Sequence, residues 1–147
     1  MMKLVSVIGG SQILPSSEEY SFAYKLGKLI AKKGWGVVCG GKSGVMEAVC
    51  RGAKEEGGLT VGIMPSLTGE DANPYVDIKI NTGLGHARNP IVVASGEIVV
   101  AIGGNYGTLS EIAYSLIYGK TVLGYKTHKI EGVIQISKPE EVKKYLK

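Results

Sequence analysis

The segment IGGNYGTLSEI, residues 102 to 112, contains the residue types best suited to bind an anion. Its glycines leave main-chain N–H groups accessible, and its threonine hydroxyl can donate a further hydrogen bond. An apolar run precedes the glycines and a helical pattern follows them. The N-terminus of a helix offers unpaired N–H groups and the positive end of a dipole. The segment therefore predicts a phosphate-binding turn made of Gly103, Gly104, Asn105, Tyr106, Gly107 and Thr108.

Glu111, in the same segment, has two interpretations. A carboxylate beside a sugar could stabilise positive charge at an anomeric carbon or orient water, as in glycosidases. However, TLSE at 108 to 111 also matches a capping box, in which the side chains of Thr108 and Glu111 bond each other's main-chain N–H groups. Helical periodicity places Glu111 about 200° from Leu109, away from the apolar stripe, so we expect the helix core not to bury it. The residues alone leave both interpretations open.

Two further glycine pairs stand in equivalent positions. Gly9 and Gly10, followed by Ser11, come after the apolar run KLVSVI, and Gly40 and Gly41 come after WGVVC. Tight turns favour glycine even without a ligand. Three glycine pairs, each between an apolar run and a helical pattern, are nevertheless more than chain turning requires. We therefore expect all of these residues to contribute to one ligand site.

The elements that must position these residues alternate along the chain. Apolar, strand-like runs occupy 3–10, 35–41, 59–65, 75–83, 96–104, 121–125 and 132–136, and helical patterns occupy 16–34, 43–57, 87–95, a segment from residue 109, and 138–147. Such alternation predicts an α/β fold, a Rossmann-like three-layer sandwich with a mostly parallel sheet. Right-handed crossovers then bring the glycine pairs to one rim of the sheet, where open α/β sheets bind ligands.

The bulk composition fits one Rossmann-like domain over residues 1–147. Hydrophobic residues make up 44% of the chain and charged residues 20%, which is enough to build one continuous core. No window contains the roughly 18 apolar residues of a membrane span and the first residues do not resemble a signal peptide, so we expect a cytoplasmic protein. Cys39 and Cys50 form no CxxC pair, so we interpret both as core thiols and expect no metal site. The net charge of +4 comes without a basic stripe, which argues against nucleic acid as a partner.

Residues 36–43, GVVCGGKS, match the P-loop pattern GxxxxGK[ST]. In a P-loop the middle residues wrap phosphates, whereas here Val37, Val38 and Cys39 are typical of a strand. The dinucleotide fingerprint GxGxxG is also absent after the first strand, so an NAD-binding function has no support.

Two segments together carry a family resemblance. VCGGKSGVMEAVCRGA at 38–53 and IGGNYGTLSEI at 102–112 resemble the two motifs of the LOG-type, "lysine decarboxylase-like" Rossmann superfamily, and GHARN at 85–89 lies where that family carries a functional arginine. The resemblance covers nearly the whole chain. Within the superfamily, the chain looks most similar to the branch that includes molybdenum-cofactor carrier proteins.

The resemblance implies a nucleotide-sized, phosphorylated ligand. In LOG members it implies hydrolysis of the N-glycosidic bond of a nucleoside 5′-monophosphate to base and ribose 5-phosphate. Gly104, Gly107 and Thr108 match the family's phosphate loop, Glu111 its acidic residue and Arg88 its arginine. The chain departs from the LOG pattern at Gly103, Asn105 and Asn89. These departures argue against LOG-type catalysis more than against ligand binding. The old "lysine decarboxylase" label would imply pyridoxal phosphate, for which no residue offers support.

Three hypotheses remain open. The first is a binder or carrier of a nucleoside monophosphate or pterin phosphate, with a nucleotide or the molybdenum cofactor as its bound ligand and no further cofactor required. The second is the phosphoribohydrolase, with Glu111 and Arg88 as catalytic residues. The third is a non-catalytic interaction module, in which Tyr114, Tyr118 and Tyr125 contact another subunit. The family implies a homodimer or larger homo-oligomer.

Overall fold

The computed structural model describes all residues, 1–147, and is built on one seven-stranded sheet in which every neighbouring pair of strands is parallel. The strands are β1 (Leu4–Gly9), β2 (Gly36–Cys39), β3 (Thr60–Met64), β4 (Ile78–Asn81), β5 (Ile98–Ile102), β6 (Thr121–Tyr125) and β7 (Val133–Gln135), in the spatial order β4-β3-β2-β1-β5-β6-β7. The predicted α/β sandwich is confirmed, with a sheet that is parallel throughout.

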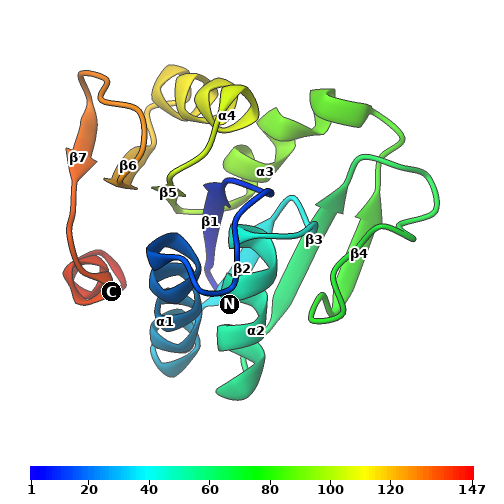
Figure 1. Cartoon of the computed structure of the whole chain (residues 1–147), viewed down its shortest axis with the longest axis horizontal. Helices are drawn as coiled ribbons and strands as arrows, with labels where there is room; N and C mark the ends of the chain where they lie inside the picture. The colour runs from blue at the N-terminus through cyan, green and yellow to red at the C-terminus, as the bar shows by residue number, and fades with distance from the viewer.

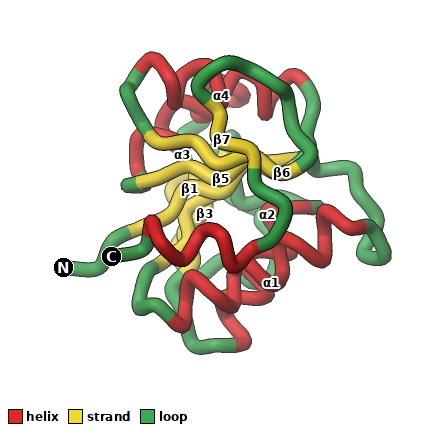
Figure 2. Tube along the Cα trace, turned by 90° about the vertical axis from the view of Figure 1, so that its left-hand side faces the viewer, coloured by secondary structure: helices red, strands yellow, loops and turns green.

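Helices cover both faces of the sheet (Figures 1 and 2). The α-helices are α1 (Glu18–Lys32), α2 (Val45–Glu55), α3 (Asn89–Ser95) and α4 (Tyr106–Ile117), and the 3-10 helices are η1 (Gly85–Arg88) and η2 (Pro139–Tyr145). Figure 1 shows α1 and α2 on one side of the sheet and α3 and α4 on the other, and Figure 2 shows the strands between these two layers. None of the helices is long and apolar enough to cross a membrane.

The core lies in two layers, one under each pair of helices. Strands with both faces covered are rich in Val and Ile, whose branched side chains pack well on a pleated surface. Between the sheet and α1 and α2, the buried cluster includes Leu26, Ile30 and Val49; between the sheet and α3 and α4, it includes Val92 and Ile112. Both cysteines are buried in the first cluster, as the composition predicts.

The direction of chain progression reverses at β1. From β1 the chain builds the sheet outward through β2, β3 and β4, then crosses back to add β5 on the other side of β1. Gly9 at the end of β1 stands beside Ile102 at the end of β5. A crevice opens at such a reversal, outside the carboxyl ends of the two strands, and this is where open α/β sheets bind ligands.

Two helical elements differ from the sequence prediction. The predicted C-terminal helix is a 3-10 helix, η2, with Pro139 as its first residue. Helix α4 begins at Tyr106, three residues before the predicted start at Leu109. The second difference changes the interpretation of the glycine-rich turn, because residues 106–108 belong to the first turn of the helix.

Candidate functional site

A cleft of about 680 Å³ opens at the reversal between β1 and β5. Most residues predicted to bind a ligand line it, although they come from four separate segments of the chain. The predicted residues in its wall are Gly9, Gly10, Ser11, Gly40, Arg88, Gly104, Asn105, Tyr106, Gly107, Thr108 and Glu111. Parallel strand ends therefore bring these residues to one rim, as the topology predicts.

The first turn of α4 presents its main-chain N–H groups without intramolecular acceptors. The N-cap residue is Asn105, whose side chain makes no capping hydrogen bond. The first helical bond runs from the Leu109 N–H to the Asn105 carbonyl, at 2.9 Å. The N–H groups of residues 104–108 find no acceptor in the chain. Free N–H groups at a helix N-terminus form an anion-binding arrangement.

Gly104 permits this turn to close tightly. Its φ of 95° is strained for a side-chain-bearing residue. A Cβ atom added there would lie 2.1 Å from the Thr108 hydroxyl oxygen. Thr108 is 4% exposed, and its hydroxyl has no hydrogen-bond partner in the chain. The hydroxyl and the free N–H groups thus remain available at the same end of the cleft.

Two predicted residues, Gly41 and Gly103, do not line the cleft. The Gly41 carbonyl turns away and accepts hydrogen bonds from the main chain and side chain of Asn73. The Gly103 N–H donates to the Tyr125 carbonyl at 3.0 Å. In these two glycine pairs one glycine belongs to the turn while its neighbour lines the cleft, whereas Gly9 and Gly10 both line it.

Arg88 is a buried residue, 7% exposed, whereas composition alone favours a surface position. Its guanidinium donates from Nε to the Ile63 carbonyl at 2.8 Å, from Nη2 to the Gly40 carbonyl at 3.3 Å, and from Nη1 to the Asn89 side chain. The absence of a side chain at Gly40 leaves room for the guanidinium, since a Cβ there would lie 2.7 Å from Nη2. Burial lowers the pKa of Arg88 from its usual value; an arginine remains charged under these conditions.

Glu111 is also 7% exposed and lines the cleft. Its carboxyl group accepts no hydrogen bond and lies beyond ion-pair distance of any cation. Burial raises its pKa from 4.5 to about 8, although the charge of Arg88 acts in the opposite direction. The group is therefore predominantly protonated at pH 7. A protonated carboxyl can donate a hydrogen bond as well as accept one.

The predicted capping box at 108–111 is wrong. Because α4 starts at Tyr106, Thr108 lies within the first turn and Glu111 in the next, where no terminal N–H groups remain to be capped. The expectation that Glu111 avoids burial is also wrong. Helical periodicity takes account of one apolar face, whereas Arg88 and the cleft wall enclose the opposite side of the helix.

Several residues line the cleft in addition to those predicted to bind a ligand. Lys42 reaches it from the loop after β2 and forms an ion pair with Asp71 at 3.8 Å. His86 reaches it from η1, next to Arg88. Asn89 links Arg88 to α4, because its side-chain oxygen accepts a hydrogen bond from Arg88 and its side-chain nitrogen donates one to the Ser110 hydroxyl at 3.3 Å. Only the spatial proximity of η1, α3 and α4 reveals these contributions.

The model of the SLOG cluster4 family matches residues 2–146. The chain belongs to the SLOG cluster4 family. An uncharacterised protein from Archaeoglobus fulgidus is 45% identical, with 98% of this chain and 95% of that protein covered. The solved structure of the molybdenum cofactor binding protein from Rippkaea orientalis shares 38% identity, covers 99% of this chain and 96% of its own, and has a TM-score of 0.91.

The solved structure of the molybdenum cofactor carrier protein from Chlamydomonas reinhardtii is also similar to this chain. It shares 32% identity, with a TM-score of 0.86 and coverage of 99% of this chain and 98% of its own. These matches confirm the superfamily, and the branch within it, that the motifs at 38–53 and 102–112 resemble.

The two cysteines of this SLOG cluster4 protein lie close together near Arg88. The Cys39 and Cys50 sulfur atoms are 3.6 Å apart, and the Gly41 N–H donates to Cys39 at 3.3 Å. The hydrogen bond from Cys50 lowers the pKa of Cys39, and the same interaction raises the pKa of Cys50 well above its usual value. No group of three or more His, Cys, Asp or Glu side chains is placed to hold a metal ion.

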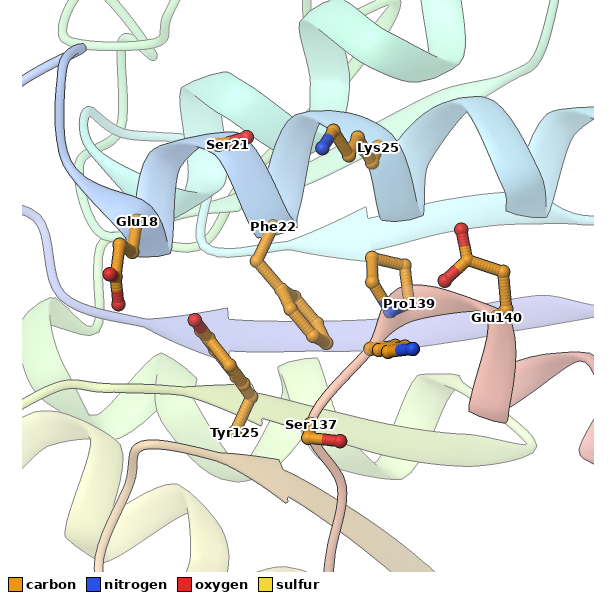
Figure 3. Close-up of a pocket in the computed structure, with 9 residues that line it drawn as sticks. Glu18, Ser21, Phe22, Lys25, Tyr125, Ser137, Pro139 and Glu140 are labelled. Atoms are coloured by element: carbon orange, nitrogen blue, oxygen red, sulfur yellow. The ribbon is translucent and has the colours of Figure 1, made fainter.

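A second, smaller hollow of about 360 Å³ lies away from every predicted site residue. Figure 3 shows it between α1 and the segment that leads into η2. Phe22 and Tyr125 stack along its wall, with ring centroids 4.0 Å apart and planes inclined by 12°. Its charged groups, among them Glu18, Lys25 and Glu140, are exposed. Exposed charges and a satisfied aromatic stack do not form a specific ligand site.

Proposed function

We propose that this protein binds a phosphorylated ligand of nucleotide size in the cleft at the ends of β1 and β5, and acts as a carrier for it. The observation that supports this most directly is the run of unpaired N–H groups at residues 104–108. An oxyanion placed there would accept several hydrogen bonds and meet the positive end of the α4 dipole. The Thr108 hydroxyl would add another donor.

The dimensions of the cleft favour a ligand larger than phosphate alone. A volume of about 680 Å³ lies within the range of about 300 to 1,000 Å³ typical of small-molecule sites. A phosphate at the start of α4 would leave room for a heterocycle. Two structural relatives are described as binding or carrying the molybdenum cofactor. We therefore favour a pterin phosphate, as in that cofactor, over a nucleoside monophosphate.

Arg88 and Glu111 would fix the orientation of the ligand. Three of the five N–H groups of Arg88 donate hydrogen bonds to protein acceptors, so two remain to bind ligand oxygens. Protonated Glu111 can donate to a ring nitrogen or carbonyl and accept from an amino group or hydroxyl. This combination suits a polar ligand edge that presents donors and acceptors side by side.

Thermal shift tests the binding proposal. The unfolding midpoint should rise with a pterin phosphate or a nucleoside 5′-monophosphate at millimolar concentration, because a ligand that binds only the native state stabilises it increasingly as the ligand concentration exceeds the Kd. The dephosphorylated compounds should give a much smaller rise. Equal shifts with and without the phosphate would refute the proposed role of residues 104–108.

The environment of Glu111 also supports the alternative, a phosphoribohydrolase. A buried carboxyl that holds its proton at pH 7 could protonate a departing base as a general acid. This alternative predicts release of ribose 5-phosphate from a monophosphate such as AMP, lost in Glu111→Gln. Binding without release by the wild type would contradict it and leave the carrier proposal.

The outer surface of α3 and α4 favours self-association. Ile91, Tyr114, Ile117 and Tyr118 are exposed there, and neither helix carries a charged side chain on that surface. Tyr125, predicted with this group, instead stacks on Phe22 on the other face. We propose a homodimer through this surface, which light scattering would test: Ile117→Glu should yield a monomer, and a monomeric wild type would refute the proposal.

A further inference from the structure

The loop after β6 contacts the glycine-rich turn from the side opposite the cleft. Three residues, Tyr125 at the end of β6 and Thr127 and His128 after it, make the contacts. The Tyr125 carbonyl accepts from the Gly103 N–H, and the Thr127 hydroxyl donates to the Gly103 carbonyl at 2.6 Å. His128 Nε2 lies 3.1 Å from the Asn105 carbonyl oxygen. A carbonyl can only accept, so Nε2 must carry the hydrogen of this bond.

These bonds set the direction of two peptide groups. In a planar trans peptide the C=O and the following N–H point in opposite directions. When Thr127 holds the Gly103 carbonyl, the Gly104 N–H must therefore point away from the loop. In the same way, His128 and the Leu109 N–H together hold the Asn105 carbonyl, and the Tyr106 N–H then points away from the loop. Gly104 and Tyr106 line the cleft, whereas Thr127 and His128 do not.

We propose that Thr127 and His128 are positioning residues that aim the N–H groups of Gly104 and Tyr106 at the bound anion. They act through the main chain of the turn and never touch the ligand. An anion site depends on donors that are oriented before the ligand arrives, because reorienting them on binding reduces affinity. This inference rests on the proposed phosphate site and names the residues that prepare it.

The backbone of the loop supports this role independently. Lys126, directly before Thr127, has a φ of 49° and is the only non-glycine residue in the left-handed region. Such a conformation is costly for a residue with a side chain, and persists where the surrounding contacts impose it. Here the reversal at Lys126 returns the next two side chains onto the turn. An ion pair between Lys126 and Glu18 of α1 holds the loop from its other side.

Matched substitutions separate the hydrogen bonds from packing. Thr127→Val removes the hydroxyl but keeps a methyl group against Gly124, where Thr127 Cγ2 now packs, while Thr127→Ser keeps the hydroxyl. For His128, glutamine can place an N–H near the position of Nε2, and leucine cannot. Titration with inorganic phosphate should give about fivefold weaker binding for Thr127→Val and His128→Leu, and near wild-type binding for Thr127→Ser and His128→Gln.

A ligand-free measurement keeps this inference distinct from the proposed function. Amide residual dipolar couplings report N–H direction, so those of Gly104 and Tyr106 should change in Thr127→Val and His128→Leu, respectively, and remain in the conservative variants. Unchanged couplings in Thr127→Val and His128→Leu would overturn the positioning role, whatever the protein binds. Altered couplings in a protein that binds no phosphate would refute the proposed function and leave the positioning role supported.

Discussion

The protonation of Glu111 gives a quantitative prediction about stability. Its pKa is 4.5 in an ordinary environment and about 8 in the native cleft, because burial disfavours the carboxylate. Near pH 4 and below, both the native and the unfolded protein hold the proton. As the pH rises from there to about 8, the unfolded chain releases the proton and the native protein retains it, so the free energy of unfolding falls. Above about pH 8 both states release it and this loss levels off.

The size of the effect follows from the difference in pKa. At about 1.4 kcal/mol per pKa unit, the interval from 4.5 to about 8 corresponds to a total loss of about 5 kcal/mol. About 3 kcal/mol of it falls between pH 5 and pH 8. In Glu111→Gln this loss should disappear, because glutamine has a similar shape and does not titrate. For a chain of this length the difference amounts to about 10 °C in the unfolding midpoint.

Urea unfolding of the two ligand-free proteins at pH 5, 6.5 and 8 measures this difference directly. Other titrating groups affect both proteins alike, so the difference between them isolates Glu111. Glu97→Gln serves as the control, because Glu97 is exposed and lies outside the cleft. If the stabilities of wild type and Glu111→Gln run parallel from pH 5 to pH 8, the native carboxyl is ionised throughout and the reasoning fails.

Three substitutions, two of them paired with a control variant, test the remaining architecture through urea unfolding and phosphate titration. Gly104→Ala should lower the free energy of unfolding by about 2 kcal/mol and abolish phosphate binding, because the added methyl group would lie 2.1 Å from the Thr108 hydroxyl oxygen. Its control is Gly119→Ala, where φ is also positive, at 73°, but no atom lies near the added methyl group. This control should lower the free energy of unfolding by only about 1 kcal/mol and bind phosphate normally. Arg88→Met should destabilise by about 3 kcal/mol, since it leaves buried carbonyls without donors, and should weaken binding. Leu26→Ala should lower the free energy of unfolding by about 3 kcal/mol, because Leu26 lies in the core, and should leave phosphate binding intact. Its control is Leu14→Ala, which should change the free energy of unfolding by less than about 0.5 kcal/mol, because the Leu14 side chain is 71% exposed. A Leu26→Ala variant as stable as wild type, or full binding by Gly104→Ala or Arg88→Met, would contradict these assignments.

Local patterns were sufficient for the framework of the fold. The strand predicted over 121–125 is β6 with the same bounds, because its apolar run is short and bounded by Gly119 and Lys126. The start of α4 was predicted too late, since Tyr106 and Gly107 carry no apolar periodicity. Their helical conformation depends on the reversal of the chain at Gly103 and Gly104, which both have positive φ.

The interior of the site could not be predicted from local patterns, because its contacts join distant parts of the chain. Arg88 is held by carbonyls of Ile63 and Gly40, which lie 25 and 48 residues away. The burial of Glu111 depends on that arrangement in turn. Only the family resemblance indicated that residues 88 and 111 belong to one site, and the structure places both in a shared buried region beside Cys39.

The distribution of costly features argues that the cleft is selected for binding. Elsewhere in the chain, the apolar faces of α1 and α2 and the buried central strands agree with the fold, as expected for a sequence that specifies one structure. Four unusual features gather at one rim of the sheet: a mostly buried carboxyl that faces the cleft, a run of unpaired N–H groups, a buried guanidinium and the left-handed Lys126. Each lowers the stability of the ligand-free protein, and no two of them compensate each other fully. An anionic ligand with a polar edge would satisfy the N–H groups, the free guanidinium donors and the carboxyl at once, so these costs are best explained as the preorganisation of a binding site.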